Sequence, residues 1–208
     1  MSPFQTSQLT VNQLSCERGS RRLFENLNFS ISSGQAMIIQ GSNGVGKTSL
    51  LRIITGLSQG LEGEICWNGE DINTINDEYH RDLLYIGHQS AVKAELTVRE
   101  NLQLLLRFWP NEKFSIAELA ETIGLRKRLS VVCSRLSAGQ QRRVSLARLF
   151  ISRQPLWVLD EPLTALDVAF IELIEERLQS HLQMGGIAVL TTHRGIDLGS
   201  QQVISLAM

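Results

Sequence analysis

The sequence has few cysteines, few prolines, little net charge and no long hydrophobic run. Its 208 residues include 3 Cys, 4 Pro and 6% aromatic residues, and the formal net charge is −1. No window reaches the ~18 apolar residues of a membrane-spanning helix, so we expect other chains to supply any membrane-spanning part. The N-terminal residues also lack the basic start and apolar run of a signal peptide.

Each absence narrows the class of protein. A near-neutral charge gives no general reason to expect nucleic-acid binding. Cys16, Cys66 and Cys133 are odd in number, widely spaced and without a CxxC pair. They are therefore expected to be free thiols in a reducing compartment, which predicts a cytosolic chain. No linker rich in Pro, Gly or Ser divides the sequence, and its length fits one domain with a small lobe.

The residue pattern predicts strands at both ends of the chain and helices in its middle. We expect strands at Leu9–Leu14, around Arg22–Phe24, and at Leu27–Ile31, Ala36–Gln40, Glu64–Trp67, Leu83–Ile86, Leu156–Leu159 and Ile187–Thr191, with Asn68-Gly69 as a hairpin turn between the fifth and sixth. We expect helices at Lys47–Thr55, Val98–Trp109, Ser115–Gly124 (opened by a capping box with Glu118), Gly139–Arg153 and Asp167–Met184. This order indicates an α/β core that carries an antiparallel N-terminal part and an inserted helical lobe.

A glycine-rich loop predicts a site for nucleotide phosphates. Residues 41–48 read GSNGVGKT, which matches G-x-x-x-x-G-K-[ST]. The candidate residues are Gly41, Ser42, Asn43, Gly44, Val45, Gly46, Lys47 and Thr48. Glycines let backbone N–H groups face an anion, and the next helix adds its positive end. Lys47 is expected to reach the β- and γ-phosphates, and the Thr48 hydroxyl to hold Mg²⁺.

A second motif supplies two carboxylates. Residues 156–161 read LWVLDE, a buried strand followed by two acids. Acids at this end of a strand lie where open α/β sheets bind ligands. Asp160 is expected to bind Mg²⁺ through water, and Glu161 to polarise the attacking water. The alternative is that the acids only mark the end of a strand.

A third motif resembles the signature of the ATP-binding cassette (ABC) family. Residues 136–140 read LSAGQ where that family usually has LSGGQ, and QRRVSLARL follows. The resemblance implies that Ser137 and Gly139 begin a helix and approach the γ-phosphate of ATP held by a second copy of the chain, forming an ATP-sandwich dimer. An anion at a helix N-terminus is stabilised by the free N–H groups and the helix dipole there. Ala138 replaces a glycine, a change that a methyl group can tolerate.

Further segments match the family in the expected order. By resemblance, Gln89 reaches the metal and senses the partner, the segment 165–167 crosses the dimer interface, and His193 contacts the γ-phosphate. The implied fold is a P-loop NTPase core with an antiparallel β-subdomain and a helical lobe, in one ABC ATPase domain of residues 1–208. The core would span 1–90 and 154–208, and the helical subdomain about 91–153. The catalytic set would be Lys47, Glu161 and His193.

Two features leave alternatives open. The family normally stacks an aromatic residue on adenine, and here that position falls at or near Arg18. A guanidinium can also stack on a ring, whereas the alternative is a solvated charge in a turn.

The stretch from Thr122 to Leu159 has no acid and eight basic residues: Arg126, Lys127, Arg128, Arg135, Arg142, Arg143, Arg148 and Arg153. It could be a solvated helical face, a positive potential near ATP, or a contact with a partner or anionic lipid. Nucleic acid is the least favoured partner, because the stretch lacks a series of aromatic platforms.

A finer resemblance is carried by CER near the start, YIGHQ, LSAGQQRRVSLARL, LDEP followed by TALD, and TTHR. In these segments the chain resembles the ATP-binding subunits of bacterial haem exporters in cytochrome c biogenesis. It implies ATP and Mg²⁺ as cofactors, integral-membrane permease subunits as partners, and a peripheral place on the cytoplasmic face of the inner membrane. Haem itself rests on resemblance, since no haem-binding CxxCH motif occurs. The alternatives are the ATPase of a transporter for another substrate, or a soluble cassette ATPase.

Overall fold

The computed structural model describes residues 4–199 and 201–208, which form two compact units. The core unit consists of residues up to Tyr85, Gln154–Glu161 and Leu178–Met208. The helical unit consists of Ile86–Arg153 and Pro162–Arg177. A compact unit is not by itself a folding domain, so the predicted boundaries of the core (1–90 and 154–208) and of the helical subdomain (about 91–153) stay a prediction.

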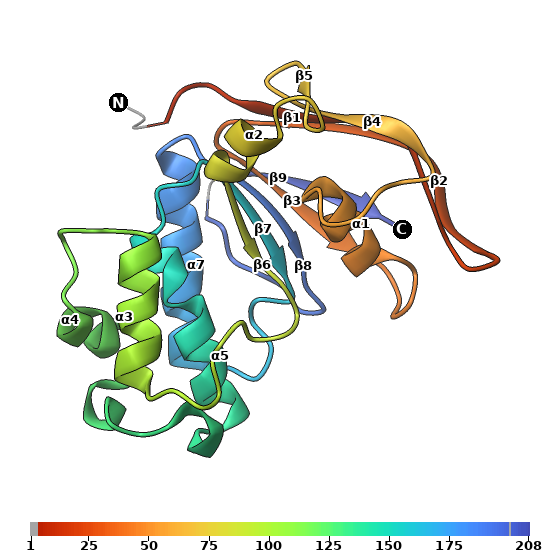
Figure 1. Cartoon of the computed structure of the whole chain (residues 1–208). Coiled ribbons are helices and arrows are strands. Elements are labelled where there is room, and N and C mark those ends of the chain that lie inside the picture. The colour runs from red at the N-terminus through yellow and green to blue at the C-terminus, as the bar shows by residue number, and fades with distance from the viewer. Residues whose placement is uncertain (1–3, 200) are drawn as a thin grey trace. The chain divides into compact units, whose positions relative to one another are not determined.

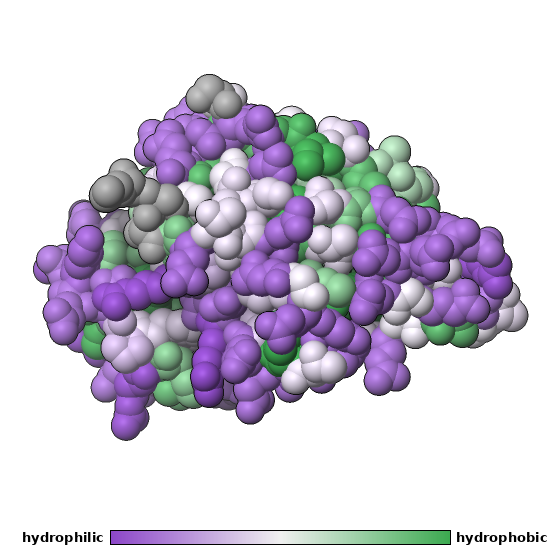
Figure 2. All heavy atoms as spheres, turned by 90° about the horizontal axis from the view of Figure 1, so that it is seen from above, coloured by the Kyte–Doolittle hydropathy of each residue, from purple (hydrophilic) through white to green (hydrophobic). Residues whose placement is uncertain are grey.

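An antiparallel sheet forms the first layer of the core unit (Figure 1). Its strands are β1 (Gln8–Arg18), β2 (Arg21–Ser32), β4 (Glu62–Trp67) and β5 (Glu70–Asp71), in the order β2-β1-β4-β5. Leu9 and Val11 are fully buried, whereas the alternate residues Gln8 and Asn12 are exposed. Such alternation is typical of a sheet with one solvated face. Hydrophilic side chains accordingly predominate on the face seen in Figure 2.

Two long strands replace the three short ones expected before residue 32. The pairing of β1 with β2 shifts register between Val11 and Leu14 and again before Cys16. Gln13 and Asn26 have φ values of 48° and 55° at these irregularities. A bulge adds an unpaired residue and interrupts the alternation of side chains. The interruptions therefore looked like strand ends in the sequence.

The Asn68-Gly69 turn forms, but it joins different strands from those expected. Asn68 and Gly69 both have positive φ, 55° and 87°, and connect β4 to the short β5. A helix that the sequence analysis missed, α2 (Asn76–Asp82), follows before β6 (Leu83–Ile86). β6 belongs to the second sheet, so the expected hairpin with Glu64–Trp67 is wrong. Two residues are too few for β5 to show a periodic pattern.

The second sheet of the core unit holds the buried strands. Its strands are β6, β7 (Leu156–Asp160), β8 (Ile187–Thr191), β3 (Gln35–Gln40) and β9 (Gln202–Ala207), in that order. β8 pairs in parallel with β7 and β3, and β3 pairs in parallel with β9 (Figure 1). Every residue of β7 and β8 is buried, as expected for parallel strands. β9 was not predicted, because as an edge strand it alternates exposed and half-buried positions.

The helical unit contains the helices α3 (Val98–Phe108), α4 (Ile116–Thr122), α5 (Ala138–Leu146), α6 (Arg148–Ile151) and the first part of α7 (Val168–Gln183). Helices were expected in all these regions. The single helix expected at Gly139–Arg153 is interrupted at Ala147, which separates α5 from α6. None of the helices in the described part of the chain is both long and apolar enough to cross a membrane. The three cysteines are free, as predicted.

Candidate nucleotide site

The glycine-rich loop lies between β3 and α1 (Lys47–Ile54), as the sequence predicted (Figure 1). Gly46 directly precedes α1 and has a φ of 118°, a conformation that L side chains rarely adopt. A Cβ atom at this position would also lie 3.1 Å from the Cβ of Leu23. The chain therefore needs glycine here to turn from the loop into the helix, whose first N–H groups stay available to an anion.

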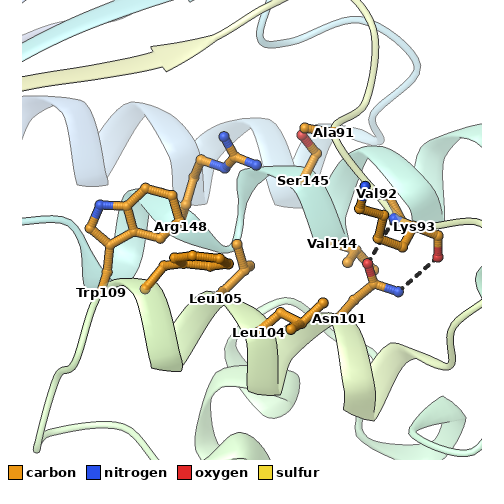
Figure 3. Close-up of a pocket in the computed structure, with 11 residues that line it drawn as sticks. Ala91, Val92, Lys93, Asn101, Leu104, Leu105, Trp109, Val144, Ser145 and Arg148 are labelled. Atoms are coloured by element: carbon orange, nitrogen blue, oxygen red, sulfur yellow. Dashed lines mark hydrogen bonds between the residues drawn. The ribbon is translucent and has the colours of Figure 1, made fainter. Parts of the chain in front are cut away.

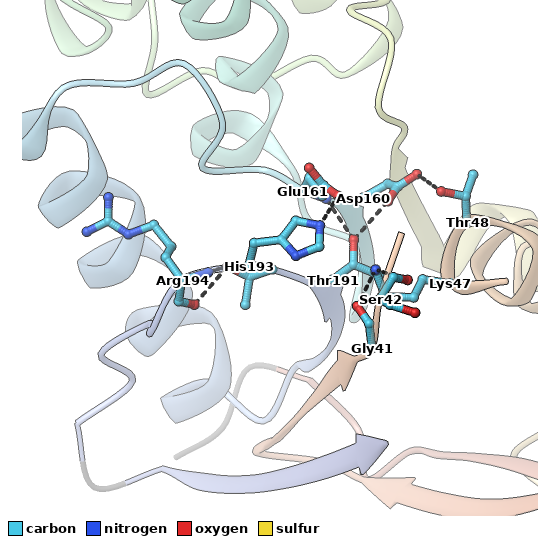
Figure 4. Close-up of polar contacts among 10 residues, drawn as sticks. Gly41, Ser42, Lys47, Thr48, Asp160, Glu161, Thr191, His193 and Arg194 are labelled. Atoms are coloured by element: carbon cyan, nitrogen blue, oxygen red, sulfur yellow. Dashed lines mark hydrogen bonds and ion pairs between the residues drawn. The ribbon is translucent and has the colours of Figure 1, made fainter. Parts of the chain in front are cut away.

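Lys47 folds back over the loop that precedes it. Its side chain is largely buried, and its Nζ donates hydrogen bonds to the carbonyl oxygens of Gly41 at 2.7 Å and Ser42 at 3.1 Å (Figure 4). These acceptors are neutral, and an ammonium binds anionic oxygen more strongly. The loop thus holds a cation where phosphate oxygens can replace its carbonyl partners.

Asp160 joins the loop to the strand ends. Its carboxylate is 2% exposed; Oδ2 accepts a hydrogen bond from Thr48 Oγ1 at 2.9 Å, and Oδ1 accepts one from Thr191 Oγ1 at 2.8 Å. The side chains of Thr48 and Asp160 offer only oxygen atoms, the ligands that Mg²⁺ prefers. No group of three or more His, Cys, Asp or Glu in residues 4–199 and 201–208 could hold a metal alone. Mg²⁺ commonly binds one or two protein groups and completes its shell with phosphate oxygens and water.

Glu161 and His193 meet beside Asp160. Glu161 Oε1 lies 2.9 Å from His193 Nε2, and the Glu161 N–H donates to Thr191 Oγ1 at 2.9 Å (Figure 4). Glu161 has a φ of 46°, an uncommon value for a residue with a side chain. Such a conformation costs about 1–3 kcal/mol and persists where the surroundings hold it. The turn after β7 thus directs the Glu161 carboxylate toward the loop after β8.

Arg18 lies at the end of β1, on a hollow that also reaches α1. The hollow has a volume of about 540 Å³ and is lined by residues that include Arg18, Thr48, Ser49 and Arg52. Thr48 is the last residue of the phosphate loop, so the hollow that Arg18 lines extends to the end of that loop. Ligand pockets of small molecules commonly measure about 300–1,000 Å³. The hollow is large enough for a nucleobase.

The signature residues begin α5 in the helical unit. Ser137 is exposed and caps α5: its Oγ accepts from the Gln140 N–H at 3.3 Å, and Gln140 Oε1 accepts from the Ser137 N–H at 3.2 Å. A Cβ atom on Gly139 would lie 2.5 Å from the carbonyl oxygen of Ala165. Glycine is therefore required at 139, whereas Ala138 is exposed and accommodates its methyl group. Gln89 is also exposed, in the segment of the helical unit that follows β6.

The segment 165–167 also contacts α5 through Asp167, its last residue. Asp167 forms an ion pair with Arg143, whose guanidinium lies 4.6 Å from the centre of the Phe170 ring. Asp167 also accepts a hydrogen bond from the Phe170 N–H at 2.9 Å. That N–H, and then Arg143, hold the pKa of Asp167 below its ordinary value. The signature helix and the segment expected at the dimer interface are thus one packed feature of the helical unit.

The basic stretch divides into buried and exposed residues, so it is more than a solvated face. Arg142 and Arg148 are largely buried, and Arg148 lies 5.7 Å from the centre of the Trp109 ring. Burial lowers the pKa of Arg148. The exposed members are Arg126, Lys127, Arg128, Arg135 and Arg153.

Two polar residues escaped the sequence analysis. Thr191 holds both Asp160 and Glu161, and Arg142 donates to the backbone of two loops. Thr191 pairs with Asp160 in the register of β7 and β8. A polar residue at the end of an apolar strand was a signal for Thr191, but its partner depends on strand order. Arg142 was visible only as one charge among eight.

A phosphate loop after β3, an acid pair after β7 of the same sheet and a capped signature helix together define an ABC ATPase. The family model described as ABC transporter matches residues 24–164, and the chain belongs to this family as one of its ATP-binding, ATP-hydrolysing subunits. The chain is similar to the cytochrome c biogenesis ATP-binding export protein CcmA of Haemophilus influenzae, with 44% identity over 206 residues, 98% of this chain and 97% of that protein. CcmA of Escherichia coli O157:H7 is 42% identical over 200 residues and 96% of each chain.

Solved structures agree with this assignment. An ATP-binding subunit of an ABC transporter superimposes with a TM-score of 0.78 at 28% identity, over 89% of this chain and 79% of that one. A putative ABC transporter ATP-binding protein from Pyrococcus furiosus gives a TM-score of 0.79 over 96% of each chain; at 23% identity this likeness concerns the fold alone. The predicted fold class, an α/β P-loop cassette, is confirmed.

Proposed function

We propose that this chain is the ATP-hydrolysing subunit of a haem exporter that serves cytochrome c biogenesis. The observation that carries the proposal is similarity over nearly the full length to export proteins named for that process. The cargo, haem, follows from the motif resemblance. Haem would be moved by membrane partners, so this chain needs no haem ligands of its own.

The chain would bind the triphosphate and Mg²⁺ through the residues described above. The loop Gly41–Thr48 would surround the phosphates with N–H groups, and Lys47 would exchange its carbonyl partners for the β- and γ-phosphate oxygens. Thr48 and Asp160, with Gln89, would hold Mg²⁺. Bound there, Mg²⁺ would neutralise charge that develops on the phosphates.

Glu161 and His193 would carry out the hydrolytic step. Glu161 would orient and polarise a water molecule in line with the γ-phosphate, and His193 would contact that phosphate. Their contact of 2.9 Å supports this assignment, because it fixes both groups at the end of the sheet where the phosphate loop also lies. Phosphoryl transfer depends on such positioning and charge neutralisation more than on covalent help.

A second copy of the chain would complete each site. Ser137 and Gly139 lie at the exposed start of α5, where free N–H groups suit an anion, and would contact the γ-phosphate of the other copy. Two ATP molecules would close the dimer, and hydrolysis would let it open.

The helical unit offers a surface for the permease subunits. A groove of about 170 Å³ runs between α3 and the helices α5 and α6, lined by Leu104, Leu105, Phe108, Trp109, Val144 and Arg148 among others (Figure 3). Phe108 is 73% exposed although it is large and apolar. A small apolar hollow edged by an exposed aromatic residue suits an apolar side chain presented by a partner helix. Docked in this way, the chain would lie peripherally on the cytoplasmic face of the inner membrane.

The variant Glu161→Gln tests the catalytic assignment. We expect it to bind ATP with wild-type affinity but to hydrolyse it about 100-fold more slowly or worse, because the amide cannot polarise water as the carboxylate does. ATP should then hold the variant as a stable dimer, measured by light scattering with and without Mg-ATP. Glu172→Gln, an exposed carboxylate on α7, is the matched control. Wild-type turnover by Glu161→Gln would contradict the assignment.

A further inference from the structure

We propose that Arg142 is a positioning residue for ATP hydrolysis, which ties the signature helix to the loops that lead to Gln89 and Glu161. The inference rests on the roles proposed above for those two residues. Neither the motifs nor the similarity to relatives assigns a role to Arg142.

The contacts of Arg142 reach two loops of the helical unit. Its side chain, on α5, is 5% exposed. Nη1 donates to the carbonyl oxygen of Gly87 at 3.1 Å, and Nε donates to the carbonyl oxygen of Pro162 at 3.4 Å. Gly87 and Pro162 both lie in irregular segments, outside any helix or strand. A hydrogen-bond donor that fixes their carbonyl groups therefore has a large influence on where these loops lie.

Each of the two loops leads directly to a proposed functional group. Gly87 is two positions before Gln89, and Pro162 immediately follows Glu161. Arg142 itself is one helical turn after Ala138, on the helix that Ser137 caps. One side chain thus connects the backbone of three segments, and each segment carries a residue expected to act at the γ-phosphate or the metal.

Arginine suits this role better than other residues. Its guanidinium is always charged and presents donors in a rigid plane, so one side chain can reach carbonyl groups of separate segments. A buried cation is stable only when such partners surround it. Lysine offers a single ammonium with the same charge, and glutamine a shorter amide without charge. Replacement should therefore loosen the loops by different amounts.

Arg177 provides a matched control within the same unit. It is also largely buried, and its Nε donates to the carbonyl oxygen of Leu149 at 2.8 Å. That bond joins α7 to α6 and touches none of the segments with proposed functional residues. A purely structural effect of losing a buried arginine should therefore appear equally at both positions.

The experiment compares Arg142→Gln, Arg142→Lys and Arg177→Gln as purified full-length chains. We expect Arg142→Gln to lower kcat about 10- to 100-fold while the Kd for ATP stays at the wild-type value, since misplaced catalytic groups slow the reaction without removing the phosphate loop. Arg142→Lys should give an intermediate kcat. Arg177→Gln should retain kcat even where its melting temperature falls as far as that of Arg142→Gln.

Two results would overturn the proposal: an unchanged kcat in folded Arg142→Gln, or an equal loss of kcat in Arg177→Gln. If Arg142→Gln fails to fold, Arg142→Lys decides, and a wild-type kcat in that variant refutes the role. Glu161→Gln in the same assay distinguishes a failure of the positioning role of Arg142 from a failure of the catalytic assignment of Glu161. If Glu161→Gln is inactive and Arg142→Gln is active, only the positioning role fails; if Glu161→Gln is active, the proposed catalytic assignment fails, and this inference with it.

Discussion

Hydroxyl groups from two segments hold the buried carboxylate of Asp160. Thr48 and Thr191 each donate to one of its oxygens, so the charge is compensated by hydrogen bonds on both sides. Burying a carboxylate without such donors would cost free energy. The same Thr191 hydroxyl accepts from the backbone of Glu161. The two acids are thereby fixed in distinct positions, one suited to Mg²⁺ and the other directed toward His193.

Arg18 offers a prediction about the base of the nucleotide. Because it lines the hollow beside Thr48, we expect its guanidinium to stack on adenine. Arg18→Ala should raise the Kd for ATP about tenfold and leave the Kd for tripolyphosphate unchanged, because tripolyphosphate has no base. Arg18→Phe should retain affinity for ATP, since a ring also stacks. Calorimetry measures these Kd values. If Arg18→Ala binds ATP with the same affinity as wild type, Arg18 is a solvated charge.

At the scale of elements, the starts of three helices share one chemistry. α3, α4 and α5 each begin with a capping box, formed by Thr97 with Glu100, Ser115 with Glu118, and Ser137 with Gln140. In such a box two backbone N–H groups without helical partners are satisfied reciprocally. The signature motif therefore stabilises the helix that it would present to phosphate. Only the box at Ser115 was recognised in the sequence, although the same spacing was readable at the other two.

The capping boxes predict how acid destabilises the helical unit. Hydrogen bonds from Thr97 and Ser115 lower the pKa values of Glu100 and Glu118 below their usual 4.5. Their contribution to the free energy of unfolding is therefore complete above pH 4.5 and is lost as the pH falls through the lower, folded-state values. The double variant Glu100→Gln/Glu118→Gln should be close to wild type at pH 7 and lose less stability on acidification. Urea unfolding from neutral to acid pH measures this difference, and parallel curves for the two proteins would refute it.

Local chemistry was predictable from the sequence, but long-range pairing was not. The turn at Asn68-Gly69, the phosphate loop and the buried strand before Asp160 follow from residue type and order. The partner of β4 after that turn, the position of β6 in the second sheet and the addition of β9 depend on tertiary contacts between distant segments. Thr191 and Arg142 belong to the same category, because each acts on residues that only the fold brings near.

The groove on the helical unit predicts how the chain associates with the membrane subunits. Phe108→Glu places a charge where an apolar partner surface would dock, at a side chain too exposed to disturb the fold. We expect a smaller fraction of the variant to be recovered with membranes while its Kd for ATP stays unchanged. Leu61→Glu, at an exposed leucine of the core unit, is the control and should behave as wild type. Equal recovery of Phe108→Glu and wild type would exclude this groove as the docking surface.

The motifs proposed for one reaction are distributed over both units. The phosphate loop, Asp160, Glu161 and His193 belong to the core unit, whereas Gln89, Ser137 and Gly139 belong to the helical unit. In a shared site, the phosphate loop of one copy would meet Ser137 and Gly139 of the other. A site shared in this way requires that no single chain can hydrolyse ATP alone.

Mixing two inactive variants measures this requirement most directly. Lys47→Ala removes the phosphate-binding ammonium, and Ser137→Asp keeps the helix cap but places a negative charge against the phosphate. Each variant alone should be inactive, but an equal mixture of freely exchanging copies should regain about a quarter of the wild-type ATPase rate, because one site of each mixed dimer is intact. Ser137→Asn, which retains the cap without the charge, should remain active. If the mixture stays as inactive as its components while mixed dimers form, the hydrolytic site is not shared between copies.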